Sequence, residues 1–256
     1  EPVITKATEV NFENGDKIGF TMTKVNGAEA YADNAALTFD GTVFSGDLKW
    51  YADAYSEADV YAYYPYNANG TPTAYFVVED QTDGIAKADL MAAVKKGVLP
   101  TPNAITMVFK HLMTKLVINI DNQSGAEVTG VEIGGCRLVT GLDISEMALT
   151  KYTDIVIEAE PLIKAYEATA GKVWQAIVIP DKAKLEIIVN LSNGKKITQP
   201  LAEMTLKSGG QYSINARLIQ DNMIVSASGE IENWTDEGEI GFDGEGTTEE
   251  LPVEFI

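Results

Sequence analysis

The stretch from Ile105 to Ile120 constrains the fold more than any other part of this chain. In its first half, the apolar side chains that share one face of an extended chain are Ile105, Met107, Phe109 and Met113. In its second half, the apolar set moves to Leu112, Leu116, Ile118 and Ile120. Because strand side chains alternate with period two, this change of phase predicts a bulge or a strand that passes from one core into another. The run is also longer than an ordinary strand, so we interpret it as the junction of two β-domains.

Dipeptides that favour tight turns punctuate the rest of the chain. Asn14-Gly15, Asp40-Gly41 and Asn193-Gly194 each lie next to segments with alternating apolar residues. Such dipeptides favour two-residue hairpins, because the central positions of the turn need positive φ. Strand-like runs recur at regular intervals in the second half, which is typical of an antiparallel sandwich, and nothing there reads as a βαβ unit. We therefore predict an all-β protein.

The predicted strands divide into two β-domains in tandem, followed by a tail. We place the N-terminal domain at residues 1–104, the C-terminal domain at residues 105–235, and an acidic tail with a terminal strand at residues 236–256. The segment from Asp89 to Gly97 predicts one short helix in the first domain. It has an acid in its first turn, lysines in its last turn and a glycine where a C-terminal cap would fall.

The chain is strongly acidic, with a formal net charge of −19 over 256 residues. This charge disfavours a phosphate backbone or an anionic membrane surface, so we predict no nucleic-acid partner. The longest apolar runs are of strand length, and no segment is expected to span a bilayer. The chain starts at Glu1 without a signal peptide, which indicates a processed form or a trimmed piece.

The usual catalytic signatures are missing, so we predict that the chain is not an enzyme and needs no cofactor. There is no phosphate-binding loop, no cysteine pair with zinc spacing and no nucleophile elbow. A nucleophile would have to recruit His111, the only histidine, which fits a structural role better. Cys136 is expected to be a small buried or half-buried thiol. The acidic segments at residues 121–127 and 236–245 lack the spacing of a calcium loop, so we predict no metal site.

Aromatic residues are dense between Trp50 and Phe76. Tyr61, Tyr63 and Tyr75 from this region are our candidate ligand-binding side chains, because tyrosine rings stack well on the apolar faces of sugars. Tyr64 and Tyr66 lie on one face of the predicted strand, and Tyr61 and Tyr63 lie on the other. Both faces are therefore expected to be at least partly covered, and packing in a core is the competing interpretation.

The chain changes character after Trp234. Up to Glu250 it is acidic, with several glycines and neither Lys nor Arg, which predicts a mobile solvated segment. At the very end Leu251, Val253 and Phe255 alternate with polar or proline positions, as in a short amphipathic strand. These three residues are our candidate donor strand, which would pair with a sheet edge of its own domain or of a neighbouring molecule. A frayed tail is the competing interpretation.

Several segments together resemble one family, the fimbrillins, which are lipoprotein-derived pilin subunits of anaerobic Gram-negative bacteria. The matching pieces are GDKIGF at 15–20, VYAYYPY at 60–66, DLMAA at 89–93, FKHLMTKL at 109–116, GGQY at 209–212 and IENW at 231–234. Their order and spacing extend over nearly the whole chain.

The resemblance implies two transthyretin-like β-sandwich domains and a role as a structural pilin in an adhesive cell-surface fimbrium, or as a tip or accessory adhesin for host or bacterial ligands. It implies export through the outer membrane as a lipoprotein precursor, membrane contact only through a lipid anchor, and other pilin subunits as partners. In such pilins a trypsin-like protease removes an N-terminal segment, usually after an arginine, and the freed groove receives a strand from the next subunit. Lys6, followed by Ala7, stands where that arginine is typical and is our candidate processing site.

Overall fold

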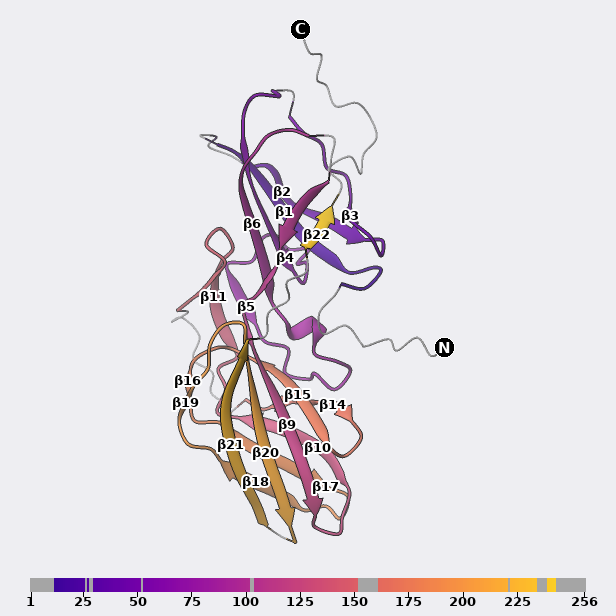
Figure 1. The fold of residues 1–256 in the computed structure, drawn as a ribbon, viewed down its shortest axis with the longest axis vertical. Helices are drawn as coiled ribbons and strands as arrows, with labels where there is room; N and C mark the ends of the chain where they lie inside the picture. The colour runs from indigo at the N-terminus through magenta and orange to yellow at the C-terminus, as the bar shows by residue number, and fades with distance from the viewer. Residues whose placement is uncertain are drawn as a thin grey trace.

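The computed structural model describes residues 12–25, 27, 30–51, 53–101, 104–151, 161–220, 222–233 and 239–242. Within these ranges the chain is an elongated molecule built from mostly antiparallel strands (Figure 1), and its helical structure is a single 3-10 turn, η1 (Ala86–Ala88). The prediction of an all-β protein is therefore confirmed.

An eight-stranded sheet forms the upper half of the molecule as drawn in Figure 1. Its strands are β1 (Lys17–Lys24), β2 (Ala30–Phe39), β3 (Phe44–Ser45), β4 (Ala58–Tyr64), β6 (Met91–Val98), β7 (Ile105–Val108), β8 (Lys110–His111) and β22 (Glu239–Phe242). Their order across the sheet is β7-β22-β3-β2-β1-β4-β6-β8. All of them except β22 come from the first 111 residues, so a strand from the end of the chain lies within a sheet made by its beginning.

Two further sheets make up the lower half. One has five strands in the order β14-β15-β9-β20-β21, and the other has four in the order β13-β10-β17-β18. The first consists of β14 (Tyr166–Thr169), β15 (Val173–Val178), β9 (Thr114–Gln123), β20 (Gly210–Ile219) and β21 (Asn222–Asn233). The second consists of β13 (Ile163–Lys164), β10 (Val128–Gly134), β17 (Glu186–Leu191) and β18 (Lys196–Pro200). Apolar residues from both sheets share one core, so the two sheets form a sandwich.

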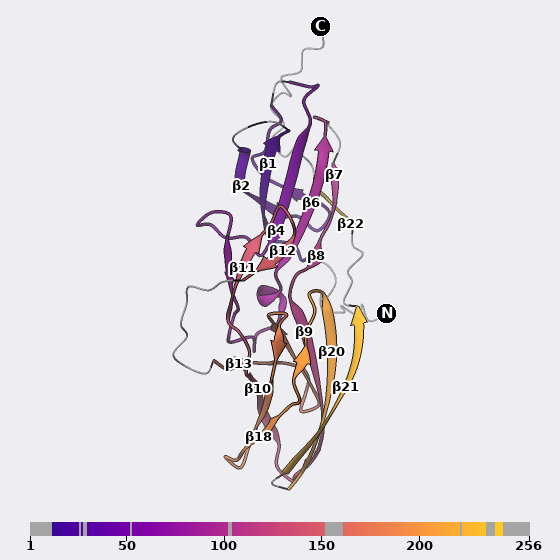
Figure 2. The same ribbon diagram turned by 90° about the vertical axis from the view of Figure 1, so that its left-hand side faces the viewer.

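Two small sheets complete the fold. β5 (Ala74–Phe76) and β12 (Ala148–Thr150) flank β11 (Val139–Asp143), and β16 (Lys182–Ala183) pairs with β19 (Met204–Thr205). The β5-β11 pairing joins residues on either side of position 104, and Figure 2 shows β11 and β12 beside β4. The domain boundaries at residues 104 and 235 therefore remain a prediction, because strands from the two predicted domains pair with each other.

The buried apolar residues form two clusters. The upper core surrounds Phe20, Val60 and Met107 on one face of the eight-stranded sheet. The lower core surrounds Leu116 and Ile187 inside the sandwich. It also reaches the other face of the upper sheet, where its members are Tyr63, Leu90 and Ala92.

The stretch from Ile105 to Ile120 passes from one core to the other, as its change of phase predicts. Ile105, Met107 and Phe109 are buried in the upper core, whereas Leu112, Leu116, Ile118 and Ile120 are buried in the lower core. The run is three strands, β7, β8 and β9, separated by short breaks. Met113, which the sequence places with the first set, belongs to the lower core, because the break after β8 interrupts the alternation.

The predicted helix from Asp89 to Gly97 is wrong. Residues 91–98 form strand β6, which pairs with β4 on one side and β8 on the other. Ala92 is buried in the lower core and Ala93 in the upper core, so the small side chains face alternately as strand packing requires. Tertiary pairing therefore overrides the weak local preference for a helix.

Two of the three predicted hairpins are confirmed. The Asp40-Gly41 turn joins β2 to β3, and the Asn193-Gly194 turn joins β17 to β18. Asn14-Gly15 forms a turn before β1, but the described residues that precede it form no strand and β1 pairs with β2. Val10, on the far side of that turn, lies outside the described residues.

Candidate functional site

The upper sheet contains a strand position that is filled from the far end of the chain. β22 lies between β3 and β7, antiparallel to β7 with Ile240 opposite Met107 and Phe242 opposite Ile105. It is parallel to β3, where the pairing is limited to Phe242 and Phe44. Figure 1 shows this yellow strand beside the indigo β3. Residues 239–242, within the segment predicted to be mobile and solvated, therefore form a strand. We call the position between β3 and β7 the strand slot.

Aromatic side chains pack behind the strand slot. Phe44 and Phe109 are buried in the upper core, and the ring of Phe12 meets them edge-on at centroid distances of 4.8 and 5.2 Å. The ring centroid of Phe12 also lies 5.3 Å from that of Tyr64. The beginning of the described chain and a strand from its end thus meet at one apolar site, which is the kind of surface that binds an extended segment.

Both predicted assembly sites lie outside the described residues. These are the processing site at Lys6 and Ala7 and the candidate donor strand at Leu251, Val253 and Phe255. Their roles stay predictions.

The three candidate ligand tyrosines pack in or against the lower core. Tyr63 is 2% exposed, and its hydroxyl donates to Oδ1 of Asn34 at 2.6 Å. Tyr61 and Tyr75 are half-buried at the edge of the same core. Burial is the main cause that raises the pKa of each of these hydroxyls. The ring of Tyr63 is closed to a ligand stacked from solvent, and the ligand role of the other two stays a prediction.

Cys136 and His111, the residues that nucleophilic catalysis would need, are both packed inside the protein. Cys136 is half-buried, and burial raises the pKa of its thiol to about 12, so the reactive thiolate is scarce at neutral pH. His111 is buried, with Nδ1 2.7 Å from Oδ2 of Asp89. Among the described residues there is no cluster of three or more His, Cys, Asp or Glu side chains that could hold a metal ion.

The part of the chain that the structure describes has no helix long and apolar enough to cross a membrane.

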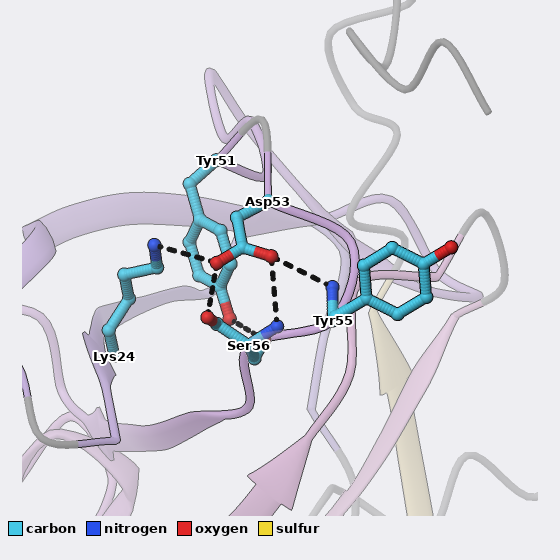
Figure 3. Close-up of polar contacts among 5 residues, drawn as sticks. All are labelled: Lys24, Tyr51, Asp53, Tyr55 and Ser56. Atoms are coloured by element: carbon cyan, nitrogen blue, oxygen red, sulfur yellow. Dashed lines mark hydrogen bonds and ion pairs between the residues drawn. The ribbon is translucent and has the colours of Figure 1, made fainter. Parts of the chain in front are cut away.

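A fixed loop before β4 presents Tyr55 (Figure 3). Oδ1 of Asp53 accepts hydrogen bonds from the backbone N–H groups of Tyr55 and Ser56 at 3.0 and 3.2 Å. The Ser56 hydroxyl donates to Oδ2 of Asp53, and Nζ of Lys24 lies 3.5 Å from the same oxygen. These contacts, the Ser56 hydroxyl first, lower the pKa of Asp53. The backbone of the loop is therefore held without burying the side chain of Tyr55.

Tyr51 also holds this loop in place. Its hydroxyl donates to the backbone carbonyl of Ser56, and its ring lies 4.4 Å from Nζ of Lys24. The ring of Tyr31 packs edge-on against Tyr51 with a centroid distance of 5.2 Å. In Figure 3 the ring of Tyr55 points away from the polar cluster, and its side chain is 84% exposed. We call residues 53–56 the Tyr55 loop.

A groove of about 810 Å³ lies at the opposite, lower end of the molecule. It is bordered by the end of β9, the β14-β15 turn, β20 and the start of β21. Oδ1 of Asn215 accepts a hydrogen bond from Nδ2 of Asn119 at 3.0 Å, and Nε of Arg217 lies 2.8 Å from Oδ2 of Asp121. We call this surface the end groove.

Sequence reasoning does not find these three surfaces. The alternation of Ile240 and Phe242 is a weak signal for β22, and Asp53 followed three residues later by Ser56 is a turn signal for the Tyr55 loop. The end groove has no local signal, because its residues come from four separate segments.

The sheets and their order define an all-β protein. The chain belongs to the fimbrillin-like family, whose family model matches residues 5–234. This match confirms the family resemblance. Membership in a fimbrillin-like family agrees with a non-enzymatic role at the cell surface.

Solved structures share the fold across most of the chain. A candidate cell adhesion protein from Bacteroides uniformis has a TM-score of 0.65 and 22% identity, with 89% of this chain and 94% of that one covered. One from Bacteroides ovatus has a TM-score of 0.66 and 22% identity, with 91% and 92% covered. The C-terminally truncated tip fimbrial protein Mfa3 from Porphyromonas gingivalis has a TM-score of 0.53 and 9% identity, with 87% and 95% covered. No curated protein sequence matches the chain.

Proposed function

We propose that this chain is a structural subunit of an adhesive cell-surface fimbrium, which polymerises when a strand from one subunit enters the upper sheet of the next. The observation that carries the proposal is the strand slot, where β22 enters a sheet otherwise made by the first part of the chain. A sheet that accepts a strand from a distant part of its own chain can accept the equivalent strand from another copy, because the main-chain hydrogen bonds are the same.

β22 has few pairing partners in the sheet, which favours its exchange for a strand from another subunit. Four of its residues pair with β7, but pairing with β3 is limited to Phe242 and Phe44. A longer donor strand would extend the pairing to Ser45, the other residue of β3. Each apolar side chain that such a strand buries contributes roughly 1.5–3 kcal/mol. The alternating residues Leu251, Val253 and Phe255 supply a donor of this kind.

The N-terminal segment is the second part of the proposed mechanism. Phe12, at the beginning of the described chain, packs on the aromatic residues behind the slot. In this proposal, cleavage after Lys6 removes the segment that precedes Ala7 before the strand of the next subunit enters the slot. Export as a lipoprotein precursor and membrane contact through its lipid anchor belong to the same proposal.

The test is a pair of truncations combined with processing by a Lys/Arg-specific protease. The full chain is treated with the protease, its new N-terminus is sequenced, and the product is viewed by negative-stain microscopy. We expect cleavage after Lys6 and filaments. A chain that ends at Glu250 should fold but form few filaments, and a chain that ends at Asn233, which also lacks β22, should form none. Normal filaments from the chain that ends at Asn233 would contradict strand addition.

A tip or accessory adhesin is the second candidate function. The observation that favours it is that Tyr61 and Tyr75 are half-buried and keep part of their surfaces in solvent. Binding to immobilised glycans that is lost in Tyr61→Ala and Tyr75→Ala would support this function. Unchanged binding in both variants, or no binding by the native chain, would contradict it.

A further inference from the structure

We propose that the two ends of this molecule recognise each other, so that the Tyr55 loop of one copy docks in the end groove of the next copy. The inference rests on the proposed function, because it describes a second contact between neighbouring subunits of a filament. It concerns surfaces that are separate from the strand slot, and it names a second copy of this chain as the occupant of the groove.

The Tyr55 loop has the properties of an interface anchor. Tyr55, with 84% of its side chain in solvent, is more exposed than any other large apolar or aromatic side chain among the described residues. The hydrogen bonds of Asp53 hold its backbone, and Tyr51 holds the loop from beneath. A prearranged aromatic side chain loses little conformational entropy on binding, and tyrosine is enriched among the residues that dominate interface energies.

The end groove offers what a tyrosine ring binds. Ile224, which is 61% exposed, and the half-buried Val173 supply apolar surface. Lys172 and Arg217 line the same groove and supply cations, which are attracted to the face of an aromatic ring. At about 810 Å³ the groove is larger than one side chain, so it also has room for the neighbours of Tyr55.

The charges of the two surfaces are complementary. Two carboxylates, Asp53 and Glu57, and one cation, Lys24, lie near Tyr51, which supports the Tyr55 loop. The charged side chains that line the end groove are two cations, Lys172 and Arg217, and one carboxylate, Asp121. Copies of a chain with a net charge of −19 repel each other, so contact is favoured where local charges of opposite sign meet.

The placement of the two surfaces leads to a filament and not to a closed dimer. The Tyr55 loop precedes β4 at the upper end of the molecule, whereas β9 and β20 run toward the lower end, where the end groove lies (Figures 1 and 2). Two different patches on opposite ends make a head-to-tail contact, and such a contact leaves one free patch at each end of every oligomer. Further copies can therefore add along the long axis.

The test uses single substitutions in the full chain and sedimentation equilibrium of the unprocessed protein. The native chain should associate into oligomers larger than dimers as its concentration rises. Tyr55→Ala and Ile224→Asp should each weaken this association about tenfold or more, since each removes an anchor contact. Tyr55→Phe, which keeps the ring, is the matched control and should retain it. Both residues are exposed, so neither change threatens the fold.

Mixing the two variants gives the decisive result. Tyr55→Ala keeps an intact groove and Ile224→Asp keeps an intact loop, so an equimolar mixture should form heterodimers and nothing larger. No association of the native chain, native association in Tyr55→Ala, or no heterodimers in the mixture would each overturn the inference.

The same variants separate this inference from strand addition. If strand addition is wrong and the end contact is right, removal of residues 234–256 leaves the Tyr55-dependent oligomers unchanged. If the end contact is wrong and strand addition is right, Tyr55→Ala forms filaments as abundant and as stable to dilution as those of the native chain.

Discussion

Asp89 and His111 lie buried beside each other where the two cores meet, with Oδ2 of Asp89 2.7 Å from Nδ1 of His111. The next residues are joined as well, because the N–H of Leu112 donates to the carbonyl of Leu90 at 2.8 Å. Oδ1 of Asp89 has no hydrogen-bond partner among the described residues. Burial raises the pKa of Asp89, and His111 and then Lys115 oppose this shift. The charge of this carboxylate in the folded protein therefore depends on His111.

Replacing His111 with alanine should strongly destabilise the protein. The change leaves a buried carboxylate without its closest partner, and breaking such a pair costs about 3–5 kcal/mol. Urea unfolding at pH 7 measures the free energy of unfolding. Lys110→Ala, which changes an exposed neighbour in the same strand, is the control and should shift it by less than about 0.5 kcal/mol. Equal unfolding midpoints for His111→Ala and the native chain would contradict the role of the pair.

The cost of His111→Ala should shrink as the pH falls. A carboxyl group with a raised folded pKa contributes stability that is present at low pH and is lost as the pH rises through that pKa. In the variant the pKa of Asp89 rises further, because a group that lowers it is missing. The difference in unfolding free energy between the two proteins should therefore be largest at neutral pH and smallest in acid. A difference in unfolding free energy that grows toward acid pH would contradict this prediction.

Lys164 should set the titration of Asp80. Nζ of Lys164 lies 2.8 Å from Oδ2 of Asp80, and this hydrogen bond is the first cause that lowers the pKa of Asp80 to about 2. In Lys164→Met the pKa should rise toward the ordinary value of 3.8, as measured by NMR titration of the carboxyl carbon. The pair is exposed, so the thermal midpoint at pH 7 should stay unchanged. Lys182→Met, which breaks a different exposed pair, should leave Asp80 unaffected.

The side chain of Gln81 should stabilise the edge of β15. Its Nε2 donates to the carbonyls of Val78 and Ile177 at 2.9 Å, and its Oε1 accepts from the N–H of Ile177 at 2.8 Å. The Gln81 side chain therefore makes the hydrogen bonds to Ile177 that a neighbouring strand would make at this edge of β15. Gln81→Ala leaves both backbone groups of Ile177 buried without these partners and should cost about 1–3 kcal/mol. Gln123→Ala, at an exposed glutamine, is the control, and equal losses in the two variants would argue against this role.

The parts of the fold that could be predicted from sequence are those that depend on local residue patterns. The change of phase between Ile105 and Ile120 marks the passage between the cores, and the Asp40-Gly41 and Asn193-Gly194 turns mark two hairpins. These features succeed because the period of a strand and the φ angles of a turn are properties of a few adjacent residues.

The parts that could not be predicted depend on distant partners. Ala92 and Ala93 carry a weak helix signal, and only the strands on both sides of β6 make the segment extended. β22 has four residues within an acidic segment, so its place between β3 and β7 depends on a gap that sequence patterns do not show. The end groove likewise exists only after four segments have folded together.

The central claim is that a strand from one subunit enters the strand slot of another. The most direct measurement mixes ¹⁴N- and ¹⁵N-labelled subunits, each with a photo-crosslinking residue in place of Val253 in the candidate donor strand, before assembly is triggered. After irradiation of the filaments, mass spectrometry identifies the peptides joined to the strand that contains Met107. We expect joined pairs that combine one labelled and one unlabelled peptide. Filaments in which every joined pair carries a single label would show that the candidate donor strand stays in its own subunit and would contradict the account.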